Sequence, residues 1–157
     1  MREPVETLIA RYKDRLFGAA FSVTQNQADA QDAVQNTFIK LYQNDPAFEN
    51  EEHLRKWLFR TVYNQAKDIR RSFWHKNRVS LCELSETYHP EPGAERDLFE
   101  AVLRLKEKER IVLQLFYYEN YSVKEMAEIL HLREATVRKQ LSRARQALKH
   151  LLDEEPL

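Results

Sequence analysis

Apolar side chains recur along most of this chain with the three-to-four-residue period of an α-helix, and runs that alternate in steps of two are scarce. Polar or helix-breaking segments such as Thr24–Gln27 and Asn44–Pro46 separate the periodic stretches. The pattern predicts an all-α protein with helices over residues 5–23, 26–44, 53–72, 94–105, 107–119, 122–130 and 134–152.

The helical period fails between residues 73 and 93. Pro90 and the pair Pro92–Gly93 interrupt this stretch, and acidic side chains replace the basic ones that precede it. Such a composition is typical of an interdomain connection. The sequence therefore predicts two small helical domains, residues 1–72 and 94–157, joined by a linker over residues 73–93.

The C-terminal part has the spacing of a helix-turn-helix. Ser122 and Glu125 form an S-x-x-E capping box, which marks a helix start. Ala127 is small enough to let a second helix cross closely, and the break falls at His131–Arg133. A positive φ at His131 is expected to cost on the order of 1 kcal/mol relative to Gly. The second helix has an apolar stripe: Val137, Leu141, Ala144, Leu148 and Leu151.

The other side of that second helix is cationic, with Glu134 as the only acid between Arg133 and His150. An amphipathic helix with a solvated charged face would also produce this run of charges. The capping box and short break before it favour a helix presented to the DNA major groove. Arg138, Lys139, Ser142 and Arg143 share an arc beside the apolar stripe. The predicted phosphate contacts are Lys124, Arg145 and Lys149.

Composition excludes several classes of fold and of cellular environment. Two glycines in 157 residues argue against a β-sandwich, a barrel or a Gly-rich nucleotide loop. The single Cys82 excludes an internal disulfide and suits a reducing cytoplasm. No apolar stretch is long enough to span a bilayer, so membrane insertion is not expected. The 25 basic and 25 acidic residues cancel in sum but are segregated, with bases gathered over residues 55–78 and 133–150.

No arrangement of residues indicates catalysis. The five histidines occur in no metal-ligand spacing, and the chain has neither a G-x-S-x-G elbow nor a Walker-type loop. Acid pairs such as Asp29 and Asp32 lie one helical turn apart, where they more often cap a helix or contact a partner. The protein is therefore predicted not to be an enzyme and to use no cofactor and no metal.

The third helix and its flanks combine aromatic and basic residues in a way that suits single-stranded nucleic acid. Aromatic faces stack unpaired bases while cations hold the backbone. Trp57 and Phe59 fit the core and a base contact about equally well, whereas Tyr63, between Arg60 and Lys67, is predicted to be exposed. The full set comprises Phe48, Trp57, Phe59, Tyr63, Phe73 and Trp74, interleaved with Arg55, Lys56, Arg60, Lys67, Arg70 and Arg71.

Three segments, in order, resemble the extracytoplasmic-function (ECF) group of bacterial RNA polymerase sigma factors. They are DAQDAVQNTFIKLYQ (residues 29–43), HLRKWLFRTVYNQAKDIRR (53–71) and ERIVLQLFYYENYSVKEMAEILHLREATVRKQLSRARQALK (109–149). The resemblance implies that the first domain docks on the polymerase clamp and opens the promoter −10 element. It also implies that the helix-turn-helix reads the −35 element. The chain departs from the family pattern at Gln31, Asn36, His131 and Arg133.

The resemblance also assigns residues. The ridge Asp29, Asp32, Gln35 and Phe38 is predicted to be exposed and to bind core polymerase. Promoter opening is assigned to Arg60, Tyr63, Asn64 and Lys67, with the loop 44–52 holding a flipped base. The −35 readers fall on Arg138, Lys139, Ser142 and Arg143. Promoter DNA, duplex at −35 and melted at −10, is the second expected partner. Members of the group commonly pair with an anti-sigma factor, which is a third candidate partner.

Two other classes stay open from the residues alone. A stand-alone helix-turn-helix regulator would explain the C-terminal domain without the first. A helical adaptor that makes only protein contacts would explain neither basic region. The sigma-factor interpretation accounts for the first domain, the C-terminal domain and both basic regions. It is the predicted function.

Overall fold

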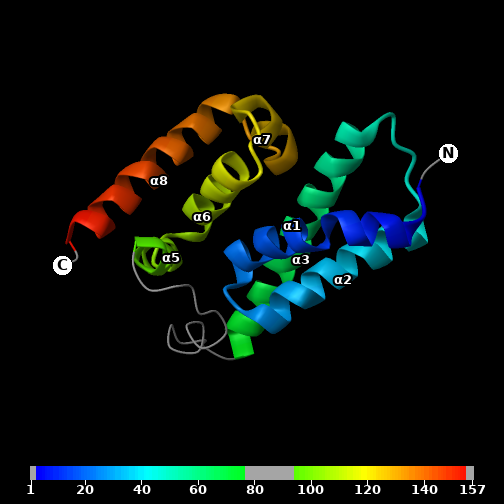
Figure 1. Ribbon diagram of the computed structural model, residues 1–157, viewed down its shortest axis with the longest axis horizontal. Helices are drawn as coiled ribbons and strands as arrows, with labels where there is room; N and C mark the ends of the chain where they lie inside the picture. Colours follow the sequence, from blue (N-terminus) through cyan, green and yellow to red (C-terminus); the bar gives the residue numbers. More distant parts are fainter. Residues whose placement is uncertain (1–2, 77–93, 155–157) are drawn as a thin grey trace. The chain divides into compact units, whose positions relative to one another are not determined.

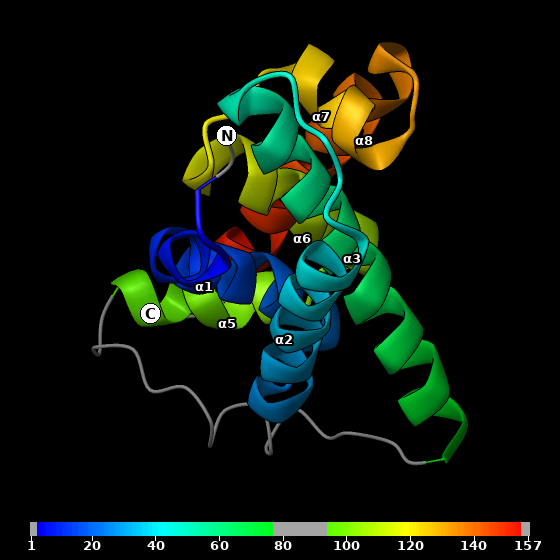
Figure 2. The same ribbon diagram turned by 90° about the vertical axis from the view of Figure 1, so that its right-hand side faces the viewer.

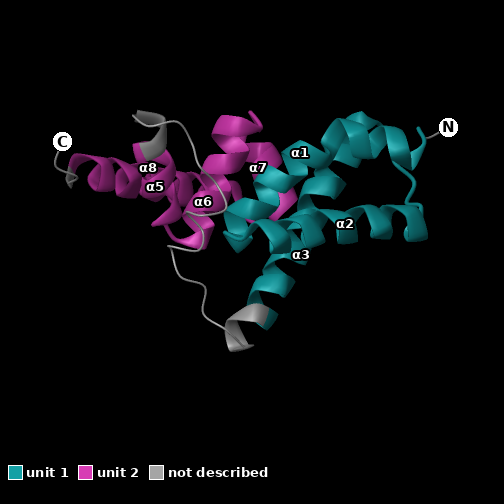
Figure 3. Cartoon of the chain, turned by 60° about the horizontal axis from the view of Figure 1, so that its bottom comes forward, with its two compact units in different colours: residues 1–78 teal, residues 79–157 magenta. Residues whose placement is uncertain are grey.

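The computed structural model describes residues 3–76 and 94–154, and every secondary-structure element within those ranges is helical. This confirms the all-α prediction. The chain divides into two compact units, residues 1–78 and 79–157 (Figure 3). None of the helices described is both long and apolar enough to cross a membrane.

Unit 1 consists of α1 (Val5–Thr24), α2 (Gln27–Asn44) and α3 (Glu51–Lys76), and each helix packs on the other two (Figure 1). The predicted apolar stripes supply its core. Because three helices share one core, each buries a broad arc rather than a narrow seam. The fully buried side chains of the unit include Leu8, Tyr12, Leu16, Val23, Leu41, Leu58, Phe59, Val62 and Tyr63.

The α1–α2 connection is short because both helix ends are capped locally. Gln25 adopts a left-handed conformation and its N–H bonds to the Phe21 carbonyl at 2.9 Å. One residue later the Asn26 side chain accepts the Asp29 N–H at 2.9 Å and so forms the N-cap of α2. From α3, Arg70 donates to the Val23 carbonyl at 2.8 Å. A cation at this C-terminus also complements the helix dipole.

Helix α3 is longer at both ends than the predicted range 53–72. Asn50 accepts the His53 N–H at 2.8 Å, so the helix begins at Glu51. Glu51 and Glu52 then occupy the first turn, where acids are favoured. At the other end α3 continues to Lys76, four residues into the predicted linker. The rest of that linker, residues 77–93, lies outside the described residues.

Unit 2 contains α5 (Ala94–Leu103), α6 (Glu107–Leu113), the π-helix η1 (Gln114–Tyr118), α7 (Val123–Leu130) and α8 (Glu134–Glu154). α8 packs against α5, α6 and α7 (Figure 2). The predicted helix over 107–119 is therefore an α-helix that widens into a π-helix in its second half. Arg110 is buried and donates to the Leu105 carbonyl in the preceding turn.

The helix-turn-helix is present as predicted. Both bonds of the capping box form: Glu125 N–H to Ser122 Oγ at 3.1 Å, and Ser122 N–H to Glu125 Oε1 at 3.0 Å. His131 has a φ of 56°, and the next N–H, of Leu132, bonds to the Ala127 carbonyl at 3.0 Å. This is a Schellman-type ending in which His131 occupies the position usually taken by Gly.

The left-handed conformation of His131 gives a test of the turn. Because Gly has no Cβ, His131→Gly should raise the free energy of unfolding by about 0.5–1 kcal/mol, after its greater unfolded-state entropy is counted. The measurement is urea unfolding of the full chain. Ala147→Gly, inside α8 where φ is helical, is the matched control and should lower stability by about 1 kcal/mol. A loss of stability in both variants would contradict the left-handed turn.

Candidate nucleic-acid interface

The loop between α2 and α3, residues 45–50, is held at its ends and its middle. Asp45 is left-handed and its N–H bonds to the Leu41 carbonyl at 3.0 Å. The Phe48 ring lies edge-on to His53 and Trp57, with centroids 5.3 and 5.8 Å away. The Glu49 N–H donates to His53 Nδ1 at 3.2 Å. The loop therefore has a defined shape beside a half-buried aromatic cluster.

A cavity of about 530 Å³ opens under this loop. Its walls are residues 45–51 together with Glu3, Leu8 and Leu54. The volume lies within the usual range of small-molecule sites, about 300–1,000 Å³. The lining residues include one aromatic, Phe48, and four acids: Glu3, Asp45, Glu49 and Glu51.

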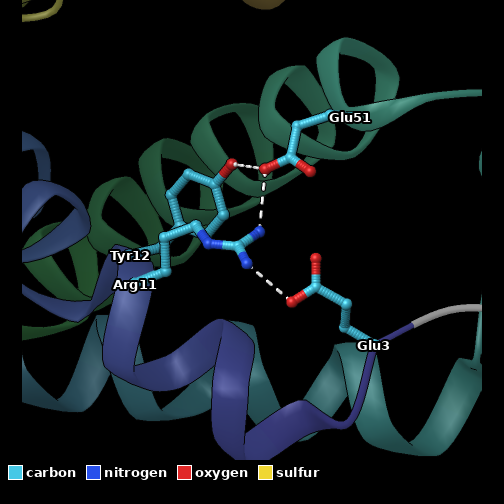
Figure 4. Close-up of polar contacts among 4 residues, drawn as sticks. All are labelled: Glu3, Arg11, Tyr12 and Glu51. Carbon is cyan, nitrogen blue, oxygen red and sulfur yellow. Dashed lines mark hydrogen bonds and ion pairs between the residues drawn. The ribbon is translucent and has the colours of Figure 1, made fainter.

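Arg11 and Tyr12 tie one wall of the cavity to α1 (Figure 4). Arg11 donates to Glu51 Oε1 at 2.9 Å and to Glu3 Oε2 at 2.6 Å, and the Tyr12 hydroxyl donates to Glu51 Oε1 at 2.6 Å. The Tyr12 hydrogen bond, with Arg11 nearby, lowers the pKa of Glu51. Burial, followed by the hydrogen bond to Glu51 and its charge, raises the pKa of Tyr12. The start of α3 is thereby anchored to α1 by a charge-assisted bond.

The predicted −10 residues of α3 do not share one exposed face. Asn64 is exposed, and Arg60 and Lys67 are half-buried. Tyr63 is only 1% exposed, so the prediction that it is the exposed aromatic is wrong. Because α3 packs on two helices, its buried arc extends from Leu58 and Val62 to include Phe59 and Tyr63. The accessible aromatics beside the cavity are Phe48 and Trp57, both half-buried.

The four residues predicted to form the polymerase-binding ridge of α2 also differ in exposure. Asp32 and Gln35 are exposed, and Asp29 is half-buried with its pKa raised by burial and by Asp32. Phe38 is 7% exposed and belongs to the core, so placing it on an exposed ridge was wrong. Steps of three residues fall about 60° short of a full turn, and nine residues after Asp29 the chain is on the opposite side. Ile39 and Tyr42, 49% and 73% exposed, continue the face of Asp32 and Gln35 instead.

The predicted −35 residues do lie on one side of α8. Arg138, Lys139, Ser142 and Arg143 are all exposed, while Val137, Leu141 and Ala144 are buried against the rest of the unit. Arg138 lies 3.9 Å from Glu134 on the same helix, an exposed pair that holds it weakly. The predicted phosphate contacts Lys124 and Lys149 are exposed as well. The sequence therefore placed this surface correctly in terms of exposure.

Arg145, the third predicted phosphate contact, has protein contacts that the sequence did not predict. Its Nε donates to the Tyr117 hydroxyl at 2.7 Å. Its guanidinium lies 5.1 Å from the Phe116 ring centroid and 5.6 Å from that of Tyr117. Tyr117 lies 28 residues away in the chain, so no local spacing could have indicated the contact. Within the described ranges, no group of three or more His, Cys, Asp or Glu could hold a metal ion.

Two family models match the chain, and they divide it as the structure does. Residues 8–75 match Sigma-70 region 2, and residues 95–148 match Sigma-70, region 4. The first match covers most of α1, all of α2 and nearly all of α3, with the loop and every cavity residue except Glu3. The second covers the helix-turn-helix with the exposed cations of α8 up to Arg145. Sigma factors as a family are not enzymes in general.

Curated relatives agree with these matches. The ECF RNA polymerase sigma factor SigL of Mycobacterium tuberculosis is 31% identical over 147 residues, 88% of this chain and 83% of the relative. The ECF RNA polymerase sigma factor SigW of Bacillus subtilis is 27% identical over 158 residues, 90% of this chain and 84% of SigW.

Two solved structures have the same fold. CnrH, solved with the cytosolic domain of CnrY, has a TM-score of 0.69 at 28% identity, covering 97% of this chain and 89% of CnrH. The sigma factor RpoE of Bartonella quintana, solved with the anti-sigma factor NepR, has a TM-score of 0.73 at 23% identity. That alignment covers 96% of this chain and 98% of RpoE. With region 2, region 4 and relatives aligned along almost its whole length, this chain belongs to the ECF RNA polymerase sigma factors, which direct promoter-specific transcription initiation.

Proposed function

We propose that the surfaces of this sigma factor divide the steps of initiation among them. The exposed face of α2 binds core RNA polymerase, α3 and the loop 45–50 hold the melted −10 element, and α8 reads the −35 element as duplex. The observation that carries this proposal is that each surface lies in the unit whose family model has the corresponding role, region 2 or region 4. Acting as a specificity subunit, the protein has no catalytic activity of its own and works beside polymerase in the cytoplasm.

In vitro transcription with purified core polymerase and a promoter library tests the proposal as a whole. Added chain should start transcripts at a subset of promoters that share −10 and −35 sequences. If no promoter gains initiation, the proposal fails. The alternative of a stand-alone helix-turn-helix regulator is not favoured, because it leaves the region 2 match over residues 8–75 without a role.

The polymerase-binding surface is assigned to Asp32, Gln35, Ile39 and Tyr42. These four are exposed and follow the helical repeat i, i+3, i+7 and i+10, so they form one continuous stripe on α2. Large apolar side chains that stay exposed beside polar ones are typical of a protein-binding surface. Tyrosine is a frequent hot spot of protein interfaces, and Tyr42, at the C-terminal end of the stripe, is its most exposed large apolar side chain.

The −10 surface is assigned to the cavity under the loop and the neighbouring side of α3. An unstacked base needs an aromatic face and a pocket that replaces its hydrogen bonds. Phe48 and Trp57 offer the face, and the cavity of about 530 Å³ offers the pocket. Asn64 and Lys67 lie farther along α3, where the strand backbone would follow, and Arg60 lies between.

A regulatory partner is also part of the proposal. One neighbouring structure holds a sigma factor together with an anti-sigma factor, and the other holds CnrH together with the cytosolic domain of CnrY. We infer that this chain too is held by an anti-sigma factor until its signal arrives. Affinity capture from the source cell followed by mass spectrometry should recover such a protein; recovery of polymerase subunits alone would point to control by expression level.

The α2 assignment predicts a loss of polymerase binding without a loss of folding. Replacing both Ile39 and Tyr42 by Ala should weaken binding to core polymerase about tenfold, because the contact loses its aromatic side chain and the neighbouring large aliphatic one. Since both side chains are exposed in the free protein, thermal unfolding should stay within a few degrees. Lys40→Ala, exposed on another side of α2, is the matched control. Equal binding by the double variant and the control would refute the assignment.

The −10 assignment predicts a defect after polymerase binding. Replacing Asn64 and Lys67 by Ala should lower open-complex formation, measured by permanganate reactivity of −10 thymines, and leave core binding unchanged. Phe48→Ala should act at the same step, because it removes a wall of the cavity. Tyr63→Ala is unsuitable as a probe, since truncating a core aromatic costs about 3–5 kcal/mol of folding free energy. Parallel loss of core binding in the first variant would mean that the surface is misassigned.

The −35 assignment separates base readers from phosphate contacts. Arg138 and Arg143 can each bind a guanine edge with two hydrogen bonds, worth about 1–3 kcal/mol of discrimination. Arg143→Ala should therefore flatten the preference of holoenzyme among −35 variants. Lys149→Ala should weaken all variants alike and reduce the salt slope by about one. The reverse pattern, measured by promoter binding at two salt concentrations, would mean that α8 presents a different side to the groove.

A further inference from the structure

The guanidinium of Arg145 is held by three contacts from one short segment, the π-helix η1. The Tyr117 hydroxyl accepts a hydrogen bond from Nε, and the Phe116 and Tyr117 ring centroids lie 5.1 and 5.6 Å from the guanidinium carbon. The two rings are themselves edge to face, with centroids 5.0 Å apart and an interplanar angle of 75°. The two rings therefore form two sides of a cation–π site for one guanidinium.

The π-helix explains how two consecutive side chains reach the same group. In η1 the Glu119 N–H bonds to the Gln114 carbonyl five residues back, at 3.2 Å. More residues per turn means less rotation per residue, so neighbouring side chains diverge less than in an α-helix. Helical widening of this kind is rare and often found at functional sites.

Arg145 lies on the side of α8 that is proposed to face DNA. Arg138, Ser142, Arg145 and Lys149 follow at i, i+4, i+7 and i+11, which is one continuous stripe along the helix. All four are exposed. Within residues 3–76 and 94–154, the terminal Nη groups of Arg145 have no hydrogen-bond partner, so the paired donors that suit a phosphate stay available.

We infer that Phe116 and Tyr117 position Arg145 as a preorganised phosphate clamp, which gives these two residues of η1 an indirect part in DNA binding. This inference rests on the proposed role of α8 and adds two residues that contact no base. A guanidinium already fixed by a hydrogen bond and two rings loses less conformational freedom when it grips a phosphate. Because a phosphate carries no sequence information, the clamp strengthens binding to all promoters equally.

The test is promoter binding by holoenzyme carrying Tyr117→Phe. This variant keeps both rings and removes only the hydroxyl that accepts from Arg145. Affinity should fall about threefold for every −35 variant, at the low end of the net value of one hydrogen bond, because the hydroxyl acts only by positioning Arg145. Tyr118→Phe is the matched control: Tyr118 is adjacent and 71% exposed, compared with 53% for Tyr117, and should bind like the parent protein.

A double-variant comparison separates positioning from a general effect on folding. In an Arg145→Ala background, which itself should reduce the salt slope by about one, Tyr117→Phe should cause no further loss. An additive loss, a change in −35 base preference, or an equal loss in Tyr118→Phe would overturn the inference. If Arg143→Ala and Lys149→Ala also leave binding unchanged, the proposed role of α8 fails as well. If those two act as expected and Tyr117→Phe does not, the clamp alone is wrong.

Discussion

The packing of α3 against both α1 and α2 decides which side chains of unit 1 can meet a partner. A helix between two neighbours buries a wide arc, so Phe59 and Tyr63 enter the core together with Leu58 and Val62. What remains accessible is the opposite side of α3 and its first turn. The anchoring of Glu51 by Tyr12 and Arg11 then fixes where that turn begins, and with it the loop that roofs the cavity. Core packing and the surface proposed to hold the −10 element therefore follow from the same constraint.

Basic residues serve two different purposes in this protein, and charge alone does not separate them. Arg70 ends α1 by donating to the Val23 carbonyl, and Arg110 is buried against the turn before α6. Lys56 pairs with Glu52 on its own helix at 3.2 Å. The cations of α8 lie exposed beside a buried stripe instead. A basic face counted from sequence thus overstates the number of phosphates that the chain can neutralise, and nonspecific DNA binding scales with that number.

The helix-turn-helix shows a local strain that the surrounding contacts support. His131 takes a left-handed conformation that favours Gly, yet the turn keeps its Schellman-type bond from Leu132 to Ala127 and the capping box at Ser122. Buried contacts of Met126, Ile129, Val137 and Leu141 fix the two helices on either side. A non-glycine residue is tolerated there because packing outweighs a cost of about 1 kcal/mol.

Local sequence signals determined much of this molecule: the helical segments, the Asn26 and Ser122 caps, the left-handed His131 and the exposed cations of α8. Each depends on neighbours within one or two turns, where spacing along the chain is also distance in space. Tertiary structure alone decided that Tyr63 and Phe38 are core residues, that Ile39 and Tyr42 continue the exposed face of α2, and that Tyr117 holds Arg145. Those outcomes depend on how many helices cover a given arc and on which distant segment faces it. The apolar period of a single helix gives neither the number of covering helices nor the identity of the facing segment, because both are set only when the unit is assembled.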